Sequence, residues 1–290
     1  MTDHHPFELQ ATADGSYTFF SAEFNQAFHS HFGAKQEAEF KFVEPLQLRQ
    51  KAQQSQISLL DICYGLGYNT AAALTAIWQT NPNCYVDWIG LELDETVPKT
   101  AIAYNLLNSY PDPIAEYLTT LAKTHQLKTD RIQAKLLIGD ARLTLQQVYH
   151  SGFKADAIFL DPFSPPACPQ LWSVEFLSLL SGCLTPKGHL ATYVCSAAAR
   201  TALMAANLNI GSTTPVGRRT PGTIASFSSV GLPPLSQPEI EHLQTRAAIA
   251  YRDPNLSDTK EVIIQRRQQQ QQQSALESTS QWKKRWQTRD

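Results

Sequence analysis

The sequence predicts an α/β fold in which βαβ units build a mostly parallel sheet. The main observation is that residues 57–195 alternate short apolar runs with longer amphipathic runs. A second observation is that turn-forming residues separate these runs, such as Pro186-Lys187-Gly188 before the fifth apolar run. The expected strands are Ile57–Ile62, Tyr85–Leu91, Ala134–Ile138, Ala157–Leu160 and His189–Val194.

The amphipathic runs between these strands are expected to be helices. Thr70–Thr80 is rich in Ala and Leu, which favour helix, and Asn81-Pro82 ends it. The expected helices are Thr70–Thr80, Val97–Thr124, Ala141–His150 and Leu171–Ser181. Two further runs, Ala202–Ile210 and Thr223–Val230, are expected to form a last helix and an edge strand.

Two extensions flank this alternating region, so we expect three segments: residues 1–56, 57–231 and 232–290. In the first segment, Tyr17–Phe20 and Glu39–Val43 are expected to be short strands, with Phe24–Phe32 as a helix between them. In the last segment, Gln237–Ala248 is expected to be a helix. The glutamine run Gln268–Gln273 is a compositional bias typical of a mobile segment or a solvent-facing helix.

Composition and charge exclude several classes of protein. No apolar run approaches the roughly 20 residues of a membrane span, and the N-terminus lacks the pattern of a signal peptide, so we expect a cytoplasmic protein with no membrane partner. The five cysteines form no CxxC pair, which favours reduced thiols over a metal site. Residues 196–290 carry 12 Lys and Arg against 7 Asp and Glu. That excess fits either a polyanion-binding surface or ordinary solvated charge.

The most informative motif is a glycine-rich turn after the first predicted strand. Asp61 ends the strand, Gly65 and Gly67 form the turn, and the helix begins beside Asn69. Glycine permits positive φ and close ligand approach, and the helix start offers unpaired N–H groups. Dinucleotide enzymes use a similar turn for pyrophosphate, which a carboxylate so close would repel. S-adenosylmethionine is cationic, so the position of Asp61 favours this cofactor.

Two further carboxylates end the next predicted strands. Glu92 follows the second strand and is suited to ribose hydroxyls, with Asp94 as its close competitor. Asp140 follows the third strand and is suited to an adenine amino group. Open α/β sheets bind ligands at the carboxyl ends of their strands, so these acids are expected to share one site. The fold class expected is therefore a class I S-adenosylmethionine-dependent methyltransferase, Rossmann-like, with a seven-stranded, mostly parallel sheet.

The fourth strand ends in a proline-rich loop that carries Asp161. Methyl transfer is an in-line displacement in which positioning supplies much of the rate. An amine acceptor must also be neutral, and a carboxylate in a partly dry pocket can align it and take up its proton. Asp161 is therefore the expected catalytic residue. The aromatic residues Phe163 and Trp172 suit either stacking on a base or packing in the core.

Together these motifs resemble the methyltransferase domain of the MnmC-like tRNA 5-methylaminomethyl-2-thiouridine enzymes. The first-strand motif of that family, D-x-C-x-G-x-G-x-N, is similar to Asp61–Asn69, and its D-G-F-[AS]-P motif is similar to Asp161–Pro165. The family's N-P-x-x-W, A-T-[YF] and G-R-[KR] segments are similar to Cys168–Trp172, Ala191–Tyr193 and Gly217–Arg219. Pro162 and Cys168 depart from the usual glycine and asparagine.

The resemblance implies N-methylation of a 5-aminomethyl group on the wobble uridine of tRNA, with S-adenosylmethionine as the donor. It implies that Asp161 faces the amine and that Glu92 and Asp140 hold ribose and adenine. Candidate substrate contacts are Phe163, Trp172, Arg218 and Arg219. No FAD signal occurs in the last 60 or so residues. The resemblance therefore implies a methyltransferase domain alone, with a separate protein supplying the aminomethyl group.

Three other functions remain open at this point. An aminopropyltransferase of the spermidine synthase type also directs an amine nucleophile on a similar sheet. A nicotinamide-dependent oxidoreductase would use a related glycine turn. A binding protein with a degenerate cofactor site would keep the fold without the chemistry.

Overall fold

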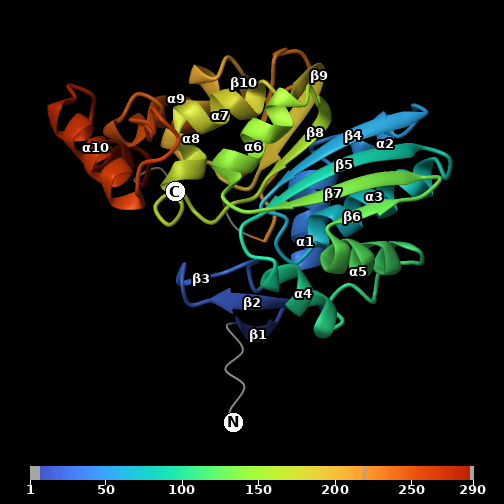
Figure 1. The fold of residues 1–290 in the computed structure, drawn as a ribbon. Coiled ribbons are helices and arrows are strands. Elements are labelled where there is room, and N and C mark those ends of the chain that lie inside the picture. Colours follow the sequence, from blue (N-terminus) through green and yellow to red (C-terminus); the bar gives the residue numbers. More distant parts are fainter. Residues whose placement is uncertain (1–6, 218–219, 288–290) are drawn as a thin grey trace, which may run out of the picture.

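An eight-stranded sheet forms the centre of the computed structural model, which describes residues 7–217 and 220–287 (Figure 1). The strand order is β10-β11-β9-β8-β4-β5-β7-β6. The strands are β4 (Gln56–Ile62), β5 (Tyr85–Glu92), β6 (Gln126–Lys128), β7 (Ile132–Ile138), β8 (Ala155–Leu160), β9 (Leu184–Thr192), β10 (Asn209–Ser212) and β11 (Thr223–Ser226). The five central strands, β9, β8, β4, β5 and β7, are parallel to one another. The outer strands β6, β10 and β11 pair antiparallel. This is the predicted fold class, with the short β6 as an additional strand.

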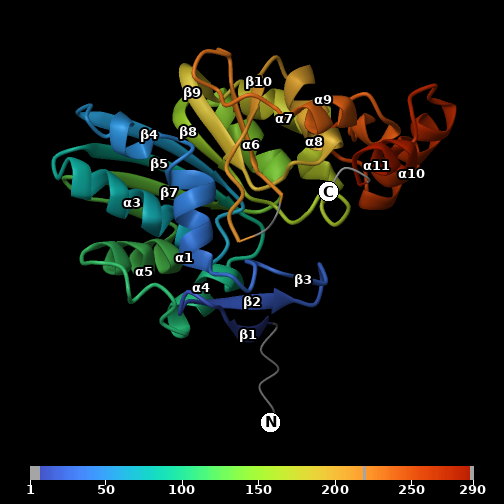
Figure 2. The same cartoon turned by 180° about the vertical axis from the view of Figure 1, so that it is seen from behind.

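Helices cover both faces of this sheet because its central strands are apolar on both sides. In β4, Leu59 packs into one core and Leu60 into the other, and both are fully buried. One layer contains α1 (Ala34–Glu37), the π-helical turn η1 (Ala38–Val43), α2 (Leu48–Lys51), α3 (Tyr68–Thr80), α4 (Thr96–Ala103) and α5 (Ile114–Thr124). The other contains α6 (Ala141–His150), α7 (Val174–Ser181) and α8 (Ala197–Ala205). Figures 1 and 2 show the two layers on opposite faces.

The N-terminal extension lies across the carboxyl ends of the parallel strands. It forms a small antiparallel sheet of β1 (Phe7–Ala11), β2 (Tyr17–Ser21) and β3 (Gln26–Ala27), followed by α1 and η1 (Figure 1). The predicted helix Phe24–Phe32 is wrong, because β3 and turns occupy it. The predicted strand Glu39–Val43 is also wrong. Phe42 and Val43 are buried in a helical turn that packs against α3, a tertiary contact that a five-residue apolar pattern does not reveal.

Several predicted helices end differently from the expectation. Val97–Thr124 divides into α4 and α5, because Asn105 takes a left-handed conformation and Pro111 and Pro113 interrupt the run. The predicted helix Ala202–Ile210 is wrong at its end, because α8 ends at Ala205 and the chain then forms β10. As a result β10 is the edge strand, and β11 lies between it and β9. Leu171–Ser181 begins as the 3₁₀ turn η2 (Pro169–Trp172), and α7 starts only after Ser173, which caps it.

The C-terminal extension packs beside α7, α8 and η2, and it is drawn in orange and red in Figures 1 and 2. It contains α9 (Gln237–His242), the 3₁₀ turn η3 (Arg246–Ala248), α10 (Lys260–Gln273) and α11 (Thr279–Gln287). The predicted helix Gln237–Ala248 is therefore shorter than expected, and the glutamine run forms the end of α10. Within residues 7–217 and 220–287, no helix is both long and apolar enough to cross a membrane.

Candidate active site

The carboxyl ends of four parallel strands meet around one cavity of about 990 Å³. Backbone hydrogen bonds hold these ends together: Gly139 N–H donates to Glu92 O at 2.8 Å, and Asp161 N–H donates to Ile62 O at 3.2 Å. Glu92, Asp140 and Asp161 all line this cavity. Three of the four predicted carboxylates thus lie around one cavity at the aligned strand ends.

The glycine turn between β4 and α3 adopts the conformation that its residues favour. Gly65 and Gly67 both have positive φ, of 59° and 86°. A Cβ atom on Gly67 would lie 2.6 Å from the Tyr64 hydroxyl, so both the backbone angle and the space require glycine. The Gly65 N–H donates to Glu92 Oε2 at 2.8 Å, which joins the turn to the end of β5.

Glu92 is buried at the cavity wall and accepts hydrogen bonds from backbone N–H groups. Its second donor is the N–H of Asp94, at 3.1 Å from Oε1. Burial raises the pKa of Glu92, and hydrogen bonds from the backbone N–H groups of Asp94, Gly65 and Leu93 partly oppose the shift. A carboxylate has about four acceptor sites, so Glu92 keeps capacity for a ligand's hydroxyl groups.

Asp61 lies behind the glycine turn and does not line the cavity. It is fully buried, with Oδ2 accepting from the Thr70 hydroxyl at 2.7 Å and Oδ1 without a hydrogen-bond partner. Burial raises the pKa of Asp61 to about 7, and the nearby Glu92 carboxylate adds to the effect. Asp61 therefore stays a predicted cofactor-binding residue, and the structure places its carboxyl group behind the turn, outside the cavity lining. Sequence reasoning located the residue but not the direction of its side chain.

Asp161 lines the cavity at the end of β8, opposite the start of α3. The Asn69 side-chain amide donates to Asp161 Oδ2 at 2.8 Å, which fixes the orientation of the carboxylate. Burial raises the pKa of Asp161 well above its ordinary value, and the Asn69 hydrogen bond opposes this. A carboxyl group with a raised pKa is a stronger proton acceptor once ionised.

A buried ion pair that the sequence did not indicate also lines the cavity. Lys41 Nζ lies 2.7 Å from Glu37 Oε1, and both residues are buried. Glu37 also accepts the Ser30 hydroxyl at 2.5 Å. Glu37 and Lys41 influence the charge state of Asp161 with opposite signs. Lys41 was missed because residues 39–43 read as a strand, whereas helical spacing places it one turn after Glu37.

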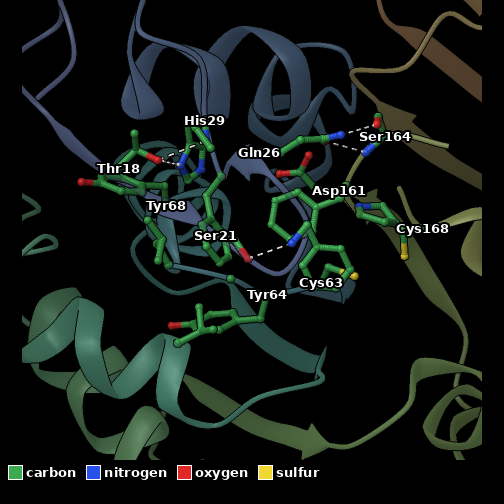
Figure 3. A pocket seen from close by; sticks show the side chains of 18 of the residues that line it. Thr18, Ser21, Gln26, His29, Cys63, Tyr64, Tyr68, Asp161, Ser164 and Cys168 are labelled. Atoms are coloured by element: carbon green, nitrogen blue, oxygen red, sulfur yellow. Dashed lines mark hydrogen bonds between the residues drawn. The ribbon is translucent and has the colours of Figure 1, made fainter. Parts of the chain in front are cut away.

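The small N-terminal sheet closes one side of the cavity. Phe24 stacks on Phe163 with ring centroids 4.4 Å apart, and Phe28 meets the same ring edge-on at 5.2 Å. Gln26 joins the loop after Asp161 through two hydrogen bonds with Ser164, of 2.6 and 3.2 Å (Figure 3). Phe163 is thus accessible from the cavity but already packed against two aromatic rings.

Asp140 caps α6 and is held by Arg142. Its Oδ1 accepts the Arg142 backbone N–H at 2.9 Å, and its Oδ2 lies 2.7 Å from Arg142 Nη2. Burial works against ionisation, but the hydrogen bonds from Arg142 prevail and lower the pKa of Asp140. Asp140 therefore stands in the cavity wall as a fixed carboxylate.

The other predicted substrate contacts are placed differently. Trp172 is fully buried in the core, and its indole N–H donates to Phe163 O at 2.9 Å, so the structure favours the packing role left open by the sequence. Trp172 is not among the residues that line the cavity. Arg218 and Arg219 lie outside the described residues.

The charges of the cavity fit a cationic ligand. Glu92, Asp140 and Asp161 line it, and the unpaired oxygen of Asp61 lies close behind. Lys41 is paired with Glu37, and Arg142 lies between the two carboxylates of Asp140 and Asp253. A sulfonium or ammonium group placed here would offset the repulsion among carboxylates that burial intensifies. Across residues 7–217 and 220–287, no group of three or more His, Cys, Asp or Glu side chains is arranged to hold a metal ion.

Comparisons with known proteins identify related methyltransferases. Residues 106–228 match a family described as S-adenosyl-L-methionine-dependent methyltransferase. The crystal structure of MnmC2 from Aquifex aeolicus superposes with a TM-score of 0.82 and 32% identity, covering 94% of this chain and 87% of that one. An uncharacterised protein of Methanocaldococcus jannaschii is 30% identical over 263 residues, which is 89% of this chain and 70% of the relative.

A longer group of relatives shares only part of its length with this chain. The tRNA 5-methylaminomethyl-2-thiouridine biosynthesis bifunctional protein MnmC of Aromatoleum aromaticum is 30% identical over 214 residues. The aligned region is 70% of this chain and 33% of that protein. The chain therefore matches about a third of the length of this bifunctional relative.

Proposed function

Because the chain belongs to the MnmC-like family of S-adenosyl-L-methionine-dependent methyltransferases, we propose that it methylates a primary amine on tRNA. The acceptor we propose is the 5-aminomethyl group of the wobble uridine, giving 5-methylaminomethyluridine with or without a 2-thio group. Membership of this methyltransferase family argues against the two alternative activities, aminopropyl transfer and nicotinamide-dependent oxidation. The bifunctional relatives are named for tRNA 5-methylaminomethyl-2-thiouridine biosynthesis, which supports this acceptor.

The observation that carries the proposal is the Asp161 carboxylate, oriented by Asn69 in the wall of a cavity that Glu92 and Asp140 also line. Bound S-adenosyl-L-methionine supplies an electrophilic methyl group. Glu92 and Asp140 would bind the adenosine part, and the buried charge of Asp61 would favour the cationic end. Each of these roles uses a carboxylate where the ligand has donors or positive charge.

Asp161 would accept a hydrogen bond from the incoming amine and then its proton. A free alkylamine has a pKa of roughly 10 and is mostly protonated near neutral pH, so a proton acceptor in the site favours the reactive neutral form. The Asn69 hydrogen bond keeps one carboxylate oxygen engaged and holds the carboxylate plane in place. Lys41 and Glu37 keep the surrounding charge balanced as the proton moves.

The test is transfer of a radiolabelled methyl group to tRNA bearing 5-aminomethyluridine. We expect label in the wild type and a loss of at least about 10²-fold in Asp161→Ala, the low end for a positioned acid–base group. Asp130→Asn, which changes an exposed acid before β7, is the matched control and keeps full activity. Undiminished transfer by Asp161→Ala would remove Asp161 from the mechanism. Absence of label on aminomethylated tRNA in the wild type would refute the proposed acceptor.

A further inference from the structure

We propose that the C-terminal extension, residues 232–287, completes the cofactor site by fixing Asp140 through Arg142 and Asp253. The inference rests on the proposed function in one respect, namely that Asp140 binds the adenosine part of the cofactor. It assigns the extension a role in cofactor affinity. Asp253 is accordingly a positioning residue, because it acts on the site only through Arg142.

The Arg142 guanidinium joins the cavity wall to the extension. One edge of it faces Asp140, with Nε 3.2 and 3.1 Å from the two carboxylate oxygens and Nη2 2.7 Å from Oδ2. Its Nη1 donates to Asp253 Oδ2 at 3.0 Å and to the Asp258 backbone carbonyl at 2.9 Å. A planar guanidinium bound on both sides cannot rotate, so it holds Asp140 in one orientation.

Asp253 is itself fully buried and held rigidly. Its Oδ1 accepts the backbone N–H groups of Ser257 and Asp258, both at 3.0 Å, which leaves Oδ2 directed at Arg142. A buried carboxylate is costly unless it is paired and hydrogen-bonded, and this one has three donors. The turn of residues 253–258 is thus built around the anchor for Arg142.

The rest of the extension holds this turn against the methyltransferase fold. The Val174 N–H donates to Tyr251 O at 3.1 Å, and the Asp253 N–H donates to Glu175 Oε2 at 2.8 Å. Ile263 of α10 is fully buried in the core that includes α6 and α7. The extension therefore packs as part of the same core, and its position is coupled to the start of α6.

Four arginine side chains of the extension fit this structural role, because each is engaged by partners within the chain. Arg252 pairs with Glu175, Arg266 with Asp258, and Arg285 with Glu241 and Glu277. The Arg267 guanidinium lies 4.5 Å from the centre of the Tyr251 ring and donates to two backbone carbonyl oxygens. These four arginines are therefore occupied by partners within the chain.

The test is binding of S-adenosylhomocysteine, measured by calorimetry without tRNA. Asp253→Asn keeps the shape and the acceptor for the two N–H groups but removes the charge facing Arg142. We expect its affinity to fall about five- to tenfold, within the range of coupling between residues in one network. Arg252→Gln, which breaks the adjacent exposed ion pair with Glu175, is the matched control and is expected to stay within about twofold.

Two further readouts separate positioning from general loss of structure. Because Asp140 is suited to the adenine amino group, Asp253→Asn and Asp140→Asn should both reduce the preference for S-adenosylhomocysteine over S-inosylhomocysteine. In turnover, Asp253→Asn should raise KM for S-adenosyl-L-methionine and leave kcat at saturation unchanged. If Asp253→Asn does not fold, Arg142→Lys, which keeps the charge but loses the planar fork, should give the same loss of base preference.

The outcomes distinguish the inference from its premise. If Asp140→Asn weakens binding and Asp253→Asn does not, the inference is overturned and Asp140 remains a ligand. If Asp140→Asn leaves affinity and base preference unchanged, the proposed site is wrong and the inference falls with it. A failure to methylate tRNA would refute the proposed acceptor without affecting either binding result.

Discussion

Replacing Gly67 by alanine should destabilise the fold and disturb the cavity together. Gly67 has φ +86°, and an added Cβ would lie 2.6 Å from Tyr64 Oη and 3.1 Å from Leu107 Cδ1. The positive φ costs roughly 1–2 kcal/mol for a residue with a side chain. Overlap in a well-packed region adds about 1–3 kcal/mol, because Tyr64 is buried and cannot move freely. We therefore expect Gly67→Ala to lose about 2–5 kcal/mol of unfolding free energy.

Gly152 provides the matched control. Its φ is +77°, but no atom lies within 4 Å of an added Cβ, so Gly152→Ala should show the backbone cost alone, roughly 1–2 kcal/mol. Both substitutions reduce unfolded-chain entropy by the same amount, so this contribution cancels in the comparison. Urea denaturation of the two variants measures the difference. Equal destabilisation of the two variants would show that the contact with Tyr64 does not require glycine at position 67. Since Tyr64 lines the cavity, only Gly67→Ala should also weaken S-adenosylhomocysteine binding.

Two remaining predictions concern pH. Burial raises the pKa of Asp61 to about 7, so a bound cationic ligand, which favours the ionised carboxylate, should release a fraction of a proton from it near pH 7. Calorimetry of S-adenosyl-L-methionine binding in buffers of different ionisation enthalpy should show this proton release in the wild type and a smaller release in Asp61→Asn. Equal proton release in both proteins would contradict the prediction. Burial opposes the shift at Glu239, but hydrogen bonds from Ser236, Ser212 and Arg200 lower its pKa to about 2. Its folded pKa lies below the ordinary 4.5, so its stabilisation is complete above pH 4.5 and lost as pH falls toward 2. Glu239→Gln should therefore lower the free energy of unfolding by about 3 kcal/mol at pH 7, because it leaves Arg200 buried with its charge unpaired. The difference in unfolding free energy between wild type and variant should become smaller as the pH falls. A difference that does not change with pH would contradict this prediction.

The sheet and its ligand-binding edge were predictable from the sequence because both depend on local patterns. Each apolar strand is followed at once by the residues of the site, so the end of the strand fixes where they lie. These residues are Gly65 and Gly67, Glu92, Asp140 and Asp161. Parallel pairing then brings the strand ends together without further information. The direction of the Asp61 side chain was not predictable in this way. The alternation of side chains along β4 indicates which face of the sheet a side chain is on, but not which residue it contacts.

The parts that sequence reasoning missed depend on contacts between distant segments. Lys41 reaches the cavity only because η1 packs against α3, and a short apolar run reads equally well as strand or helix. Asp253 is more than 100 residues from Arg142, and nothing in the local sequence of either indicates the pairing. The positive balance of the C-terminal region was visible in the composition, whereas its internal ion pairs required coordinates.

A crystal structure with S-adenosylhomocysteine bound is the decisive experiment for this site. We expect the ligand in the 990 Å³ cavity, with its ribose against Glu92, its adenine beside Asp140, and its sulfur directed toward Asp161. Density for the ligand at any other surface, or a ligand in this cavity with its sulfur directed away from Asp161, would contradict it.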